Sequence, residues 1–314
     1  MIFLLYLLVI FLLFAVHSAF VIYAMGPMLL LQPTRRREEW YARLTRLLHP
    51  SDAGLPQEDL QILTRDGLKL DCWLIQQPRA ARGTMLYLHG VGDCKIDGVR
   101  MAQFLFRHGY NVFLYDSRQH GQSEGSFCTY GFYEKYDVSS VIDYLESRKD
   151  LRLGPIGIFG TSMGGAVAIQ TAAIDRRISA IVAQASFTEL RKVFVDYQKR
   201  ITRIPWHFIR NVAIGRSQKM ANFKARFVSP LEDVKRLHCP ILFIHGTEDV
   251  NIKPEYSRAL HASAHEPKKL LLIHGAQHND VWDVGGKVYE QALEDFFLKY
   301  VNRKSLRSLL KKVK

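Results

Sequence analysis

Residues 157–165 read GIFGTSMGG and place a single serine, Ser162, among four glycines. Glycine loses more conformational entropy on folding than other residues, so this run indicates a very tight turn or a close approach of another group. An apolar run at 156–159 precedes it, and a helical pattern at 163–174 follows. The stretch is therefore a G-x-S-x-G sequence between a strand and a helix. Gly160 and Gly164 permit the turn, and the serine hydroxyl is exposed above the sheet.

Short apolar runs bounded by glycine alternate with helix-length stretches along most of the 314 residues. This alternation predicts an α/β fold with a mostly parallel, doubly wound sheet covered by helices on both faces. The predicted strands are 85–88, 112–115, 156–159, 178–183, 241–244 and 270–273, and the predicted helices are 98–108, 133–149, 163–174, 254–264 and 287–300. Upstream, the runs 59–64 and 68–75 flank Asp66-Gly67 and predict an antiparallel hairpin.

A serine hydroxyl needs a base to become a nucleophile, and the base needs an orienting acid. His278 lies in the loop after the last predicted strand, and we prefer it to the neighbouring His274, which lies nearer the strand end. The loop after strand 241–244 offers Asp249 and the rival Glu248. The order Ser162, Asp249, His278 is the one expected for an α/β-hydrolase fold.

These pieces together resemble the α/β-hydrolase superfamily, in a membrane-anchored branch similar to prolyl-oligopeptidase and serine-aminopeptidase-like hydrolases. The resemblance runs from about residue 60 to 300 and rests on the elbow and on LHG (88–90), DSRQHGQS (116–123), HGTED (245–249) and GAQH (275–278). It favours Asp249 over Glu248. It also implies an oxyanion hole made by the backbone N–H groups of Val91 and Met163, and it gives 116–123 a structural role.

The amino-terminal residues are almost wholly apolar up to the first charged side chain, Arg35. A helix over residues 1–31 is long enough to cross a hydrocarbon core of about 30 Å. A cleavable signal peptide is the competing interpretation, with a weak cleavage site at 16–18. No basic residue precedes the apolar run, which favours an uncleaved anchor. Arg35-Arg36-Arg37 follows the span directly, so the positive-inside rule places the hydrolase domain on the cytoplasmic side.

The net charge of +13 is concentrated at 35–50, 190–228 and 299–314. A basic protein of this kind can bind nucleic acid. Because one basic segment adjoins the apolar span and the tail 303–314 has the pattern of a basic amphipathic helix, an anionic membrane surface is the simpler partner. Solvated basic faces without a partner are the remaining interpretation, and no nucleic acid is expected.

The predicted domain order is an anchor at 1–31, a juxtamembrane linker helix within 32–58, the hydrolase domain at 59–302 and the basic tail. Residues 186–236 form a longer connection than a simple crossover needs, and relatives carry a cap at this place. Its aromatic and basic side chains suit an acyl chain with a polar or anionic head, although ordinary core packing of two helices explains them equally well.

The sequence therefore predicts a membrane-anchored serine hydrolase of lipophilic esters or thioesters, working through an acyl-enzyme. A peptidase or amidase of the same fold and a catalytically idle membrane scaffold are the alternatives. No metal or organic cofactor is expected. His261 and His265 have a helical i, i+4 spacing, but no third metal ligand is evident. The four cysteines, Cys72, Cys94, Cys128 and Cys239, form no metal-type cluster and agree with a reducing compartment.

Overall fold

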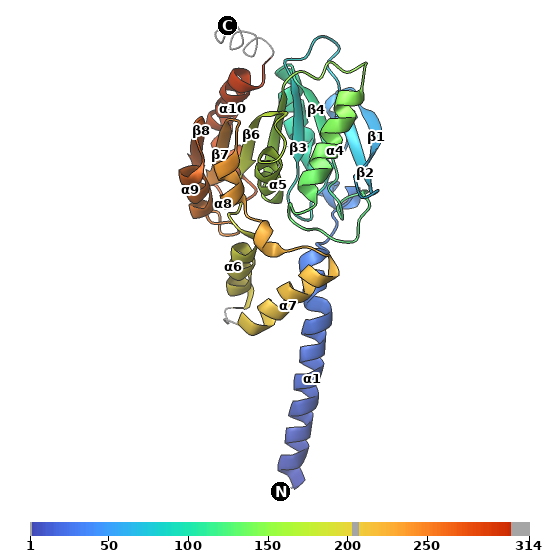
Figure 1. The fold of residues 1–314 in the computed structure, drawn as a ribbon, viewed down its shortest axis with the longest axis vertical. Helices are drawn as coiled ribbons and strands as arrows, with labels where there is room; N and C mark the ends of the chain where they lie inside the picture. Colours follow the sequence, from blue (N-terminus) through green and yellow to red (C-terminus); the bar gives the residue numbers. More distant parts are fainter. Residues whose placement is uncertain (1, 203–206, 303–314) are drawn as a thin grey trace.

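The computed structural model describes residues 2–202 and 207–302, and an eight-stranded sheet forms its centre (Figure 1). The strand order is β1-β2-β4-β3-β5-β6-β7-β8. The strands are β1 (Glu58–Leu63), β2 (Lys69–Ile75), β3 (Thr84–Leu88), β4 (Asn111–Tyr115), β5 (Ile156–Thr161), β6 (Ile178–Gln184), β7 (Ile241–Gly246) and β8 (Lys268–Ile273). All of the predicted strands are present, so the predicted sheet is confirmed.

Only β2 runs against the other strands of this sheet. It pairs antiparallel with β1 and with β4, whereas the pairs from β4 to β8 are parallel. The β1–β2 hairpin turns at Asp66-Gly67, where Gly67 has a φ of 84°. The carboxyl ends of the parallel strands lie at one edge, so the loops that follow them meet there.

Helices cover both faces of the sheet. Alternate side chains of β3 show this directly, because Leu86 and Leu88 join one core cluster and Met85 and Tyr87 join the other. On the first face lie α4 (Glu134–Ser147), α5 (Met163–Ala172) and α9 (Pro254–Ser263), and on the second lie α3 (Val99–Arg107) and α10 (Val281–Tyr300). The last helix begins earlier than predicted and bends at Gly286, whose φ is 45°.

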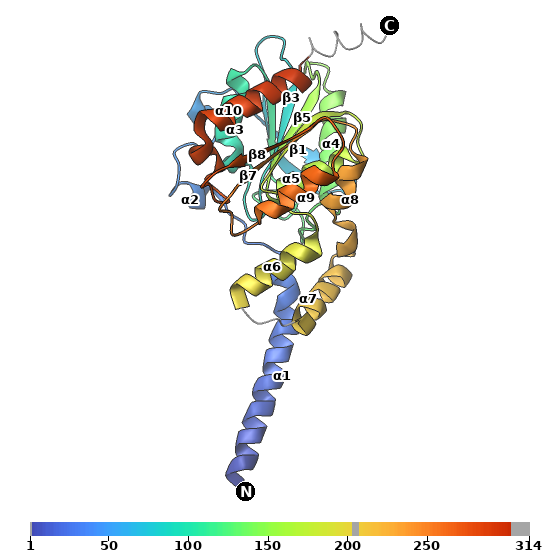
Figure 2. The same ribbon diagram turned by 90° about the vertical axis from the view of Figure 1, so that its left-hand side faces the viewer.

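One of the described helices, α1 (Ile2–Leu31), is long and apolar enough to cross a membrane. It projects from the molecule at the end where α6 (Leu190–Thr202) and α7 (His207–Met220) lie (Figures 1 and 2). Its carboxyl-terminal part packs on α7. A Cβ added to Gly26 would lie 3.2 Å from the Cβ of Ala213, and the Arg216 guanidinium lies 3.8 Å from the centre of the Tyr23 ring.

The predicted linker helix is wrong in length, because the structure forms only α2 (Glu38–Tyr41) between α1 and a short 3-10 helix, η1 (Pro50–Ala53). The first residues of the predicted linker helix form contacts far along the chain instead. The Arg35 side chain donates to the carbonyls of Ser123 and Gly125, more than 80 residues away. At the other end His49 precedes a proline, which disfavours helical backbone. Long-range polar contacts thus replace the local helix.

The connection at 186–236 contains α6, α7 and a short helix, α8 (Pro230–Asp233). The first of these helices is joined to the main core by buried Leu190 and Val193, and Phe194 packs edge-on against Tyr130. Part of its apolar surface is therefore core packing. The predicted basic tail at 303–314 lies outside the described residues. The four cysteines are buried and form no disulfide.

Candidate active site

Ser162 stands on a strained turn at the carboxyl edge of the sheet. Its φ of 54° and ψ of −115° are unusual for a residue with a side chain, and such backbone costs about 1–3 kcal/mol. Its N–H donates to the carbonyl of Gln184 at 2.8 Å. A Cβ on Gly164 would lie 2.0 Å from the Leu88 oxygen, and one on Gly160 would lie 2.2 Å from the Gly164 oxygen. Glycine is therefore required at both positions, because any side chain would collide with backbone atoms.

His278 and Asp249 lie where the sequence predicts them, within reach of this serine. Nε2 of His278 is 3.1 Å from Oγ of Ser162, and its Nδ1 is 2.6 Å from Oδ2 of Asp249. Because a carboxylate oxygen only accepts, Nδ1 carries the proton and donates to Asp249. The other nitrogen, Nε2, is then free to accept the hydroxyl proton of Ser162.

Asp249 is held by more than one partner. Its carboxylate is buried, which opposes ionisation, but hydrogen bonds from His245 and His278 outweigh burial and hold the pKa of Asp249 well below its ordinary value. The N–H groups of Asn251 and Ile252 add two bonds of 2.8 Å to its other oxygen. His245 lies in the HGTED stretch, but its contact with Asp249 at 3.2 Å was not foreseen. The acid is thus a fixed anion beneath the His278 ring.

The rival residues point elsewhere. His274 and Glu248 are both exposed, and the Ser162 hydroxyl has its hydrogen-bond partner in His278 instead. His261 lies with its ring edge-on to Phe243 at 6.1 Å. Within residues 2–202 and 207–302, no group of three or more metal-binding side chains includes His261 or His265. Ser162, Asp249 and His278 are the site residues that the structure brings together.

Two backbone N–H groups are available beside the serine. Val91 follows Gly90, whose backbone lies close to the serine. A Cβ added to Gly90 would lie 3.6 Å from the Ser162 Cβ. Met163 is the first residue of α5, a place where helical N–H groups have no intrahelical acceptor. Among the described residues no backbone carbonyl accepts from Val91 or Met163. Both donors are free to bind an oxyanion.

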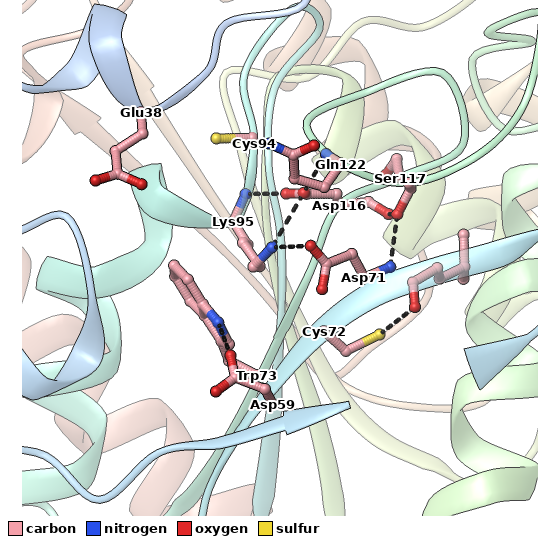
Figure 3. Close-up of polar contacts among 12 residues, drawn as sticks. Glu38, Asp59, Asp71, Cys72, Trp73, Cys94, Lys95, Asp116, Ser117 and Gln122 are labelled. Atoms are coloured by element: carbon pink, nitrogen blue, oxygen red, sulfur yellow. Dashed lines mark hydrogen bonds and ion pairs between the residues drawn. The ribbon is translucent and has the colours of Figure 1, made fainter. Parts of the chain in front are cut away.

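A buried polar network supports the loop that carries Val91. The Lys95 N–H donates to Asp116 at 2.6 Å, and Nζ of Lys95 contacts Asp116 at 3.2 Å and Asp71 at 2.8 Å (Figure 3). The same ammonium lies 4.6 Å from the centre of the Trp73 ring. Burial opposes the charge on Lys95, but the two carboxylates outweigh it and raise its pKa. The network ties the loop after β3 to the loop after β4.

His89 makes a second tie between these loops. Its Nε2 accepts from the N–H of Ser117 at 2.9 Å, so Nδ1 carries the proton and donates to the Gly90 carbonyl at 2.7 Å. Burial lowers the pKa of His89, which favours this neutral form. The DSRQHGQS stretch thus acts as support, as the resemblance implies.

A cavity of about 680 Å³ opens beside Ser162 and His278. Part of its wall is aromatic, from Tyr87, Phe159, Trp282 and Tyr289. Asp93 and Asp97 also line it. Tyr87 donates a hydrogen bond to Asp97, and lost solvation together with the charge of Asp93 raises the pKa of Asp97 to about 7. The cavity lining therefore combines aromatic and acidic side chains.

The segment after α1 builds much of this wall, which the sequence did not indicate. It contributes Arg36, Trp40, Tyr41, Leu44, Thr45 and Leu47. Of the cap residues whose side chains are described, Tyr197 alone lines the cavity. Among the described side chains, the segment after α1 therefore contributes more of the cavity lining than the connection at 186–236 does. The apolar residues 40, 44 and 47 are spaced i, i+4 and i+7, which suggests one face of a helix but not what that face would cover.

Several known proteins are similar to this chain in sequence and fold. The profile of a family described as serine aminopeptidase, S33, matches residues 79–230. WAV2 of Arabidopsis thaliana, an alpha/beta hydrolase domain-containing protein, is 28% identical over 267 residues, which cover 81% of this chain and 83% of WAV2. YqkD of Bacillus subtilis is 28% identical over 221 residues, covering 70% of this chain and 72% of YqkD.

The chain is an α/β-hydrolase. The esterase Pf2001 of Pyrococcus furiosus superposes on this hydrolase with a TM-score of 0.70 at 22% identity, covering 86% of this chain and 99% of the esterase. The acylaminoacyl peptidase of Pyrococcus horikoshii gives 0.62 at 16% identity, covering 79% of this chain and 42% of the peptidase. At these identities the superpositions show the fold alone.

Replacing Lys95 by methionine tests the polar network of this hydrolase. Lys95→Met leaves two carboxylates without their buried cation, so we expect the free energy of unfolding to fall by about 3–5 kcal/mol. Denaturant titration of the purified protein measures it. Lys69→Met is the matched control on β2, because its side chain is exposed, and its effect is expected to stay within about 0.5 kcal/mol. Equal effects of the two substitutions would contradict a stabilising role for the network.

Proposed function

We propose that the protein is a membrane-anchored serine hydrolase that cleaves lipophilic esters or thioesters through an acyl-enzyme. Ser162 attacks the carbonyl carbon while His278 takes its proton, and Asp249 stabilises the resulting imidazolium. The N–H groups of Val91 and Met163 bind the oxyanion. His278 then protonates the leaving alcohol or thiol as its bond to carbon breaks, and water releases the acid by the reverse sequence.

The observation that carries this proposal is the continuous chain of contacts from Asp249 to His278 to Ser162, at 2.6 and 3.1 Å. A packing serine at a tight turn needs neither partner. Here the serine has an acceptor aimed at its hydroxyl, and that acceptor is oriented by a buried anion. Such an arrangement is what an activated nucleophile requires.

The position of α1 supports a membrane substrate. This apolar helix leaves the molecule at the end where α6 follows the carboxyl edge of the sheet (Figure 1). The segment after α1 also lines the cavity beside Ser162. A substrate held in a bilayer around α1 thus has a short path to the nucleophile, and the aromatic walls suit an acyl chain.

An anionic membrane surface is the partner we propose for the basic residues near α1. The exposed cations on α6 and α7 are Arg191, Lys192, Lys199, Arg200 and Lys219. They lie at the end of the molecule from which α1 projects (Figure 2). Each such charge near an anionic leaflet contributes about 1 kcal/mol. These charges favour lipid head groups over nucleic acid as the partner, because they gather beside an apolar helix.

Peptide or amide hydrolysis is the second candidate function. It is favoured by the serine aminopeptidase profile and by the superposed acylaminoacyl peptidase. The same triad serves both reactions, which differ in the leaving group. A scaffold without activity would leave the contacts among Ser162, His278 and Asp249 without a purpose.

Paired substitutions test the catalytic roles. Ser162→Ala abolishes labelling by a fluorophosphonate probe, and Asp249→Asn lowers kcat by about 10⁴, as loss of the orienting acid does in serine proteases. His278→Ala lowers kcat at least as far, because the base is lost. The exposed neighbours supply controls: His274→Ala and Glu248→Gln keep wild-type rates. Unlabelled, folded wild-type protein would remove the serine-hydrolase proposal and favour the scaffold.

A panel of acyl esters and peptide amides separates the two candidate functions. We expect kcat/KM to rise about fourfold for each methylene added to the acyl chain until the cavity is full, since each buried methylene contributes about 0.8 kcal/mol. Leu44→Trp narrows the cavity and shortens the preferred chain. Leu63→Trp is the control on an exposed leucine of β1. Faster turnover of peptide amides than of any ester would favour the peptidase.

The cytoplasmic placement of the hydrolase domain has a separate test. The charges at 35–37 predict that a reporter fused after Lys314 is active inside the cell. A phosphatase reporter, active only outside the cytoplasm, serves as the opposite readout in the same cells. Activity of the phosphatase alone would reverse the proposed topology.

A further inference from the structure

The end of α1 is built into the catalytic edge of the sheet. Leu31 is 1% exposed and belongs to the main core cluster. The Leu31 carbonyl accepts from the N–H of Cys128 at 2.7 Å, and the Leu30 carbonyl accepts from the Tyr130 hydroxyl at 2.7 Å. The chain that leaves α1 is therefore fixed to the hydrolase domain from its first residues.

Arg36, five residues after Leu31, binds the loop that carries Val91. Its backbone N–H donates to the Gly92 carbonyl at 3.0 Å, and its guanidinium forms an ion pair with Asp93. The Tyr41 hydroxyl donates to the same Asp93 oxygen at 3.1 Å and accepts from the Cys94 N–H at 3.3 Å. This clamp, formed by Arg36 and Tyr41, holds three consecutive residues of the loop.

The clamp acts next to the predicted oxyanion donor. Asp93 donates its N–H to the Gly90 carbonyl at 3.3 Å, which closes a tight turn with Val91 inside it. Gly92 has a φ of 80°, and a Cβ there would lie 3.1 Å from the Thr34 carbonyl. The loop thus touches the segment after α1 backbone to backbone. The Lys95 network holds the loop on its inner side (Figure 3), and the clamp holds the outer side.

We propose that Arg36 is a positioning residue for the oxyanion hole, acting through Asp93 and Gly92 on the N–H of Val91. This inference rests on the proposed serine-hydrolase function. An oxyanion donor stabilises the transition state only when it is fixed in place before the reaction. Arg36 supplies that constraint from the chain that leaves α1, so the segment after the anchor belongs to the catalytic machinery.

Arg36 also lines the cavity, so the competing role is binding an anionic part of the substrate. The two roles differ in kinetics. A substrate-binding cation raises KM with kcat unchanged, whereas a positioning residue lowers kcat with little change in KM. A short neutral ester such as p-nitrophenyl butyrate offers no anion, so its hydrolysis responds to positioning alone.

The experiment compares Arg36→Gln, Arg36→Lys and Arg37→Gln in the full chain in detergent. We measure the rate constant for fluorophosphonate labelling of Ser162, and kcat and KM for p-nitrophenyl butyrate. Arg36→Gln is expected to lower the labelling rate and kcat by about 10- to 100-fold, less than the 10²- to 10³-fold cost of removing an oxyanion donor, with KM within about twofold. Arg36→Lys restores part of the loss because it keeps the charge. Arg37 is the exposed neighbour, and no hydrogen bond or ion pair joins its side chain to the loop in the described part of the chain, so Arg37→Gln keeps the wild-type rate.

Two further variants cover a failure to fold. Tyr41→Phe removes one hydrogen bond to Asp93 and lowers kcat in the same direction by a smaller factor. The double variant that combines Arg36→Asp with Asp93→Arg exchanges the two charges. It is expected to be more active than either single variant. Wild-type labelling of folded Arg36→Gln, or a rise in KM alone, overturns the positioning role and leaves the serine hydrolase intact. If the folded wild type itself is not labelled, both proposals fall.

Discussion

Backbone packs directly against backbone where β5 passes into α5, and the catalytic edge depends on this contact. Gly164 lies so close to the end of β3 that the Leu88 oxygen occupies the place of a side chain. The approach brings the loop after β3 beside the first turn of α5. Ser162 keeps its unfavourable φ because the residues on both sides have no freedom to relax. One contact thus sets the nucleophile and both candidate oxyanion donors relative to each other.

The polar residues around this contact are mostly arranged for support. Asp249 has four hydrogen-bond donors within reach, and only one of them belongs to the proposed base. Lys95 and Asp116 are buried with their charges paired, which is weak evidence for stability but does fix the register of two loops. The site is therefore held by groups that never meet a substrate.

Much of this organisation was readable in the sequence. Strands buried on both faces appear as continuous apolar runs, and parallel strands bring their following loops to one edge. Ser162 and His278 could be placed for that reason, and the family resemblance favoured Asp249 over Glu248. The course of the segment after α1 could not be predicted, because Arg35 and Arg36 have partners more than 50 residues away. Composition at 35–49 favours a helix, and only the tertiary contacts show that the chain instead lines the cavity.

The boundary between α1 and the hydrolase domain lies at one place in the hydropathy pattern and at another in the fold. Hydropathy ends the apolar segment at residue 31, but the core already includes Leu31, and the carbonyls of Leu30 and Leu31 satisfy two groups of the domain. A protease that cuts near residue 20 releases a domain that keeps this last turn. A cut after Leu31 removes it and leaves the Tyr130 hydroxyl and Cys128 N–H unpaired, at about 1–3 kcal/mol each. Cleavage at these two sites would thus give two products of different stability, although they differ by only one short stretch of helix.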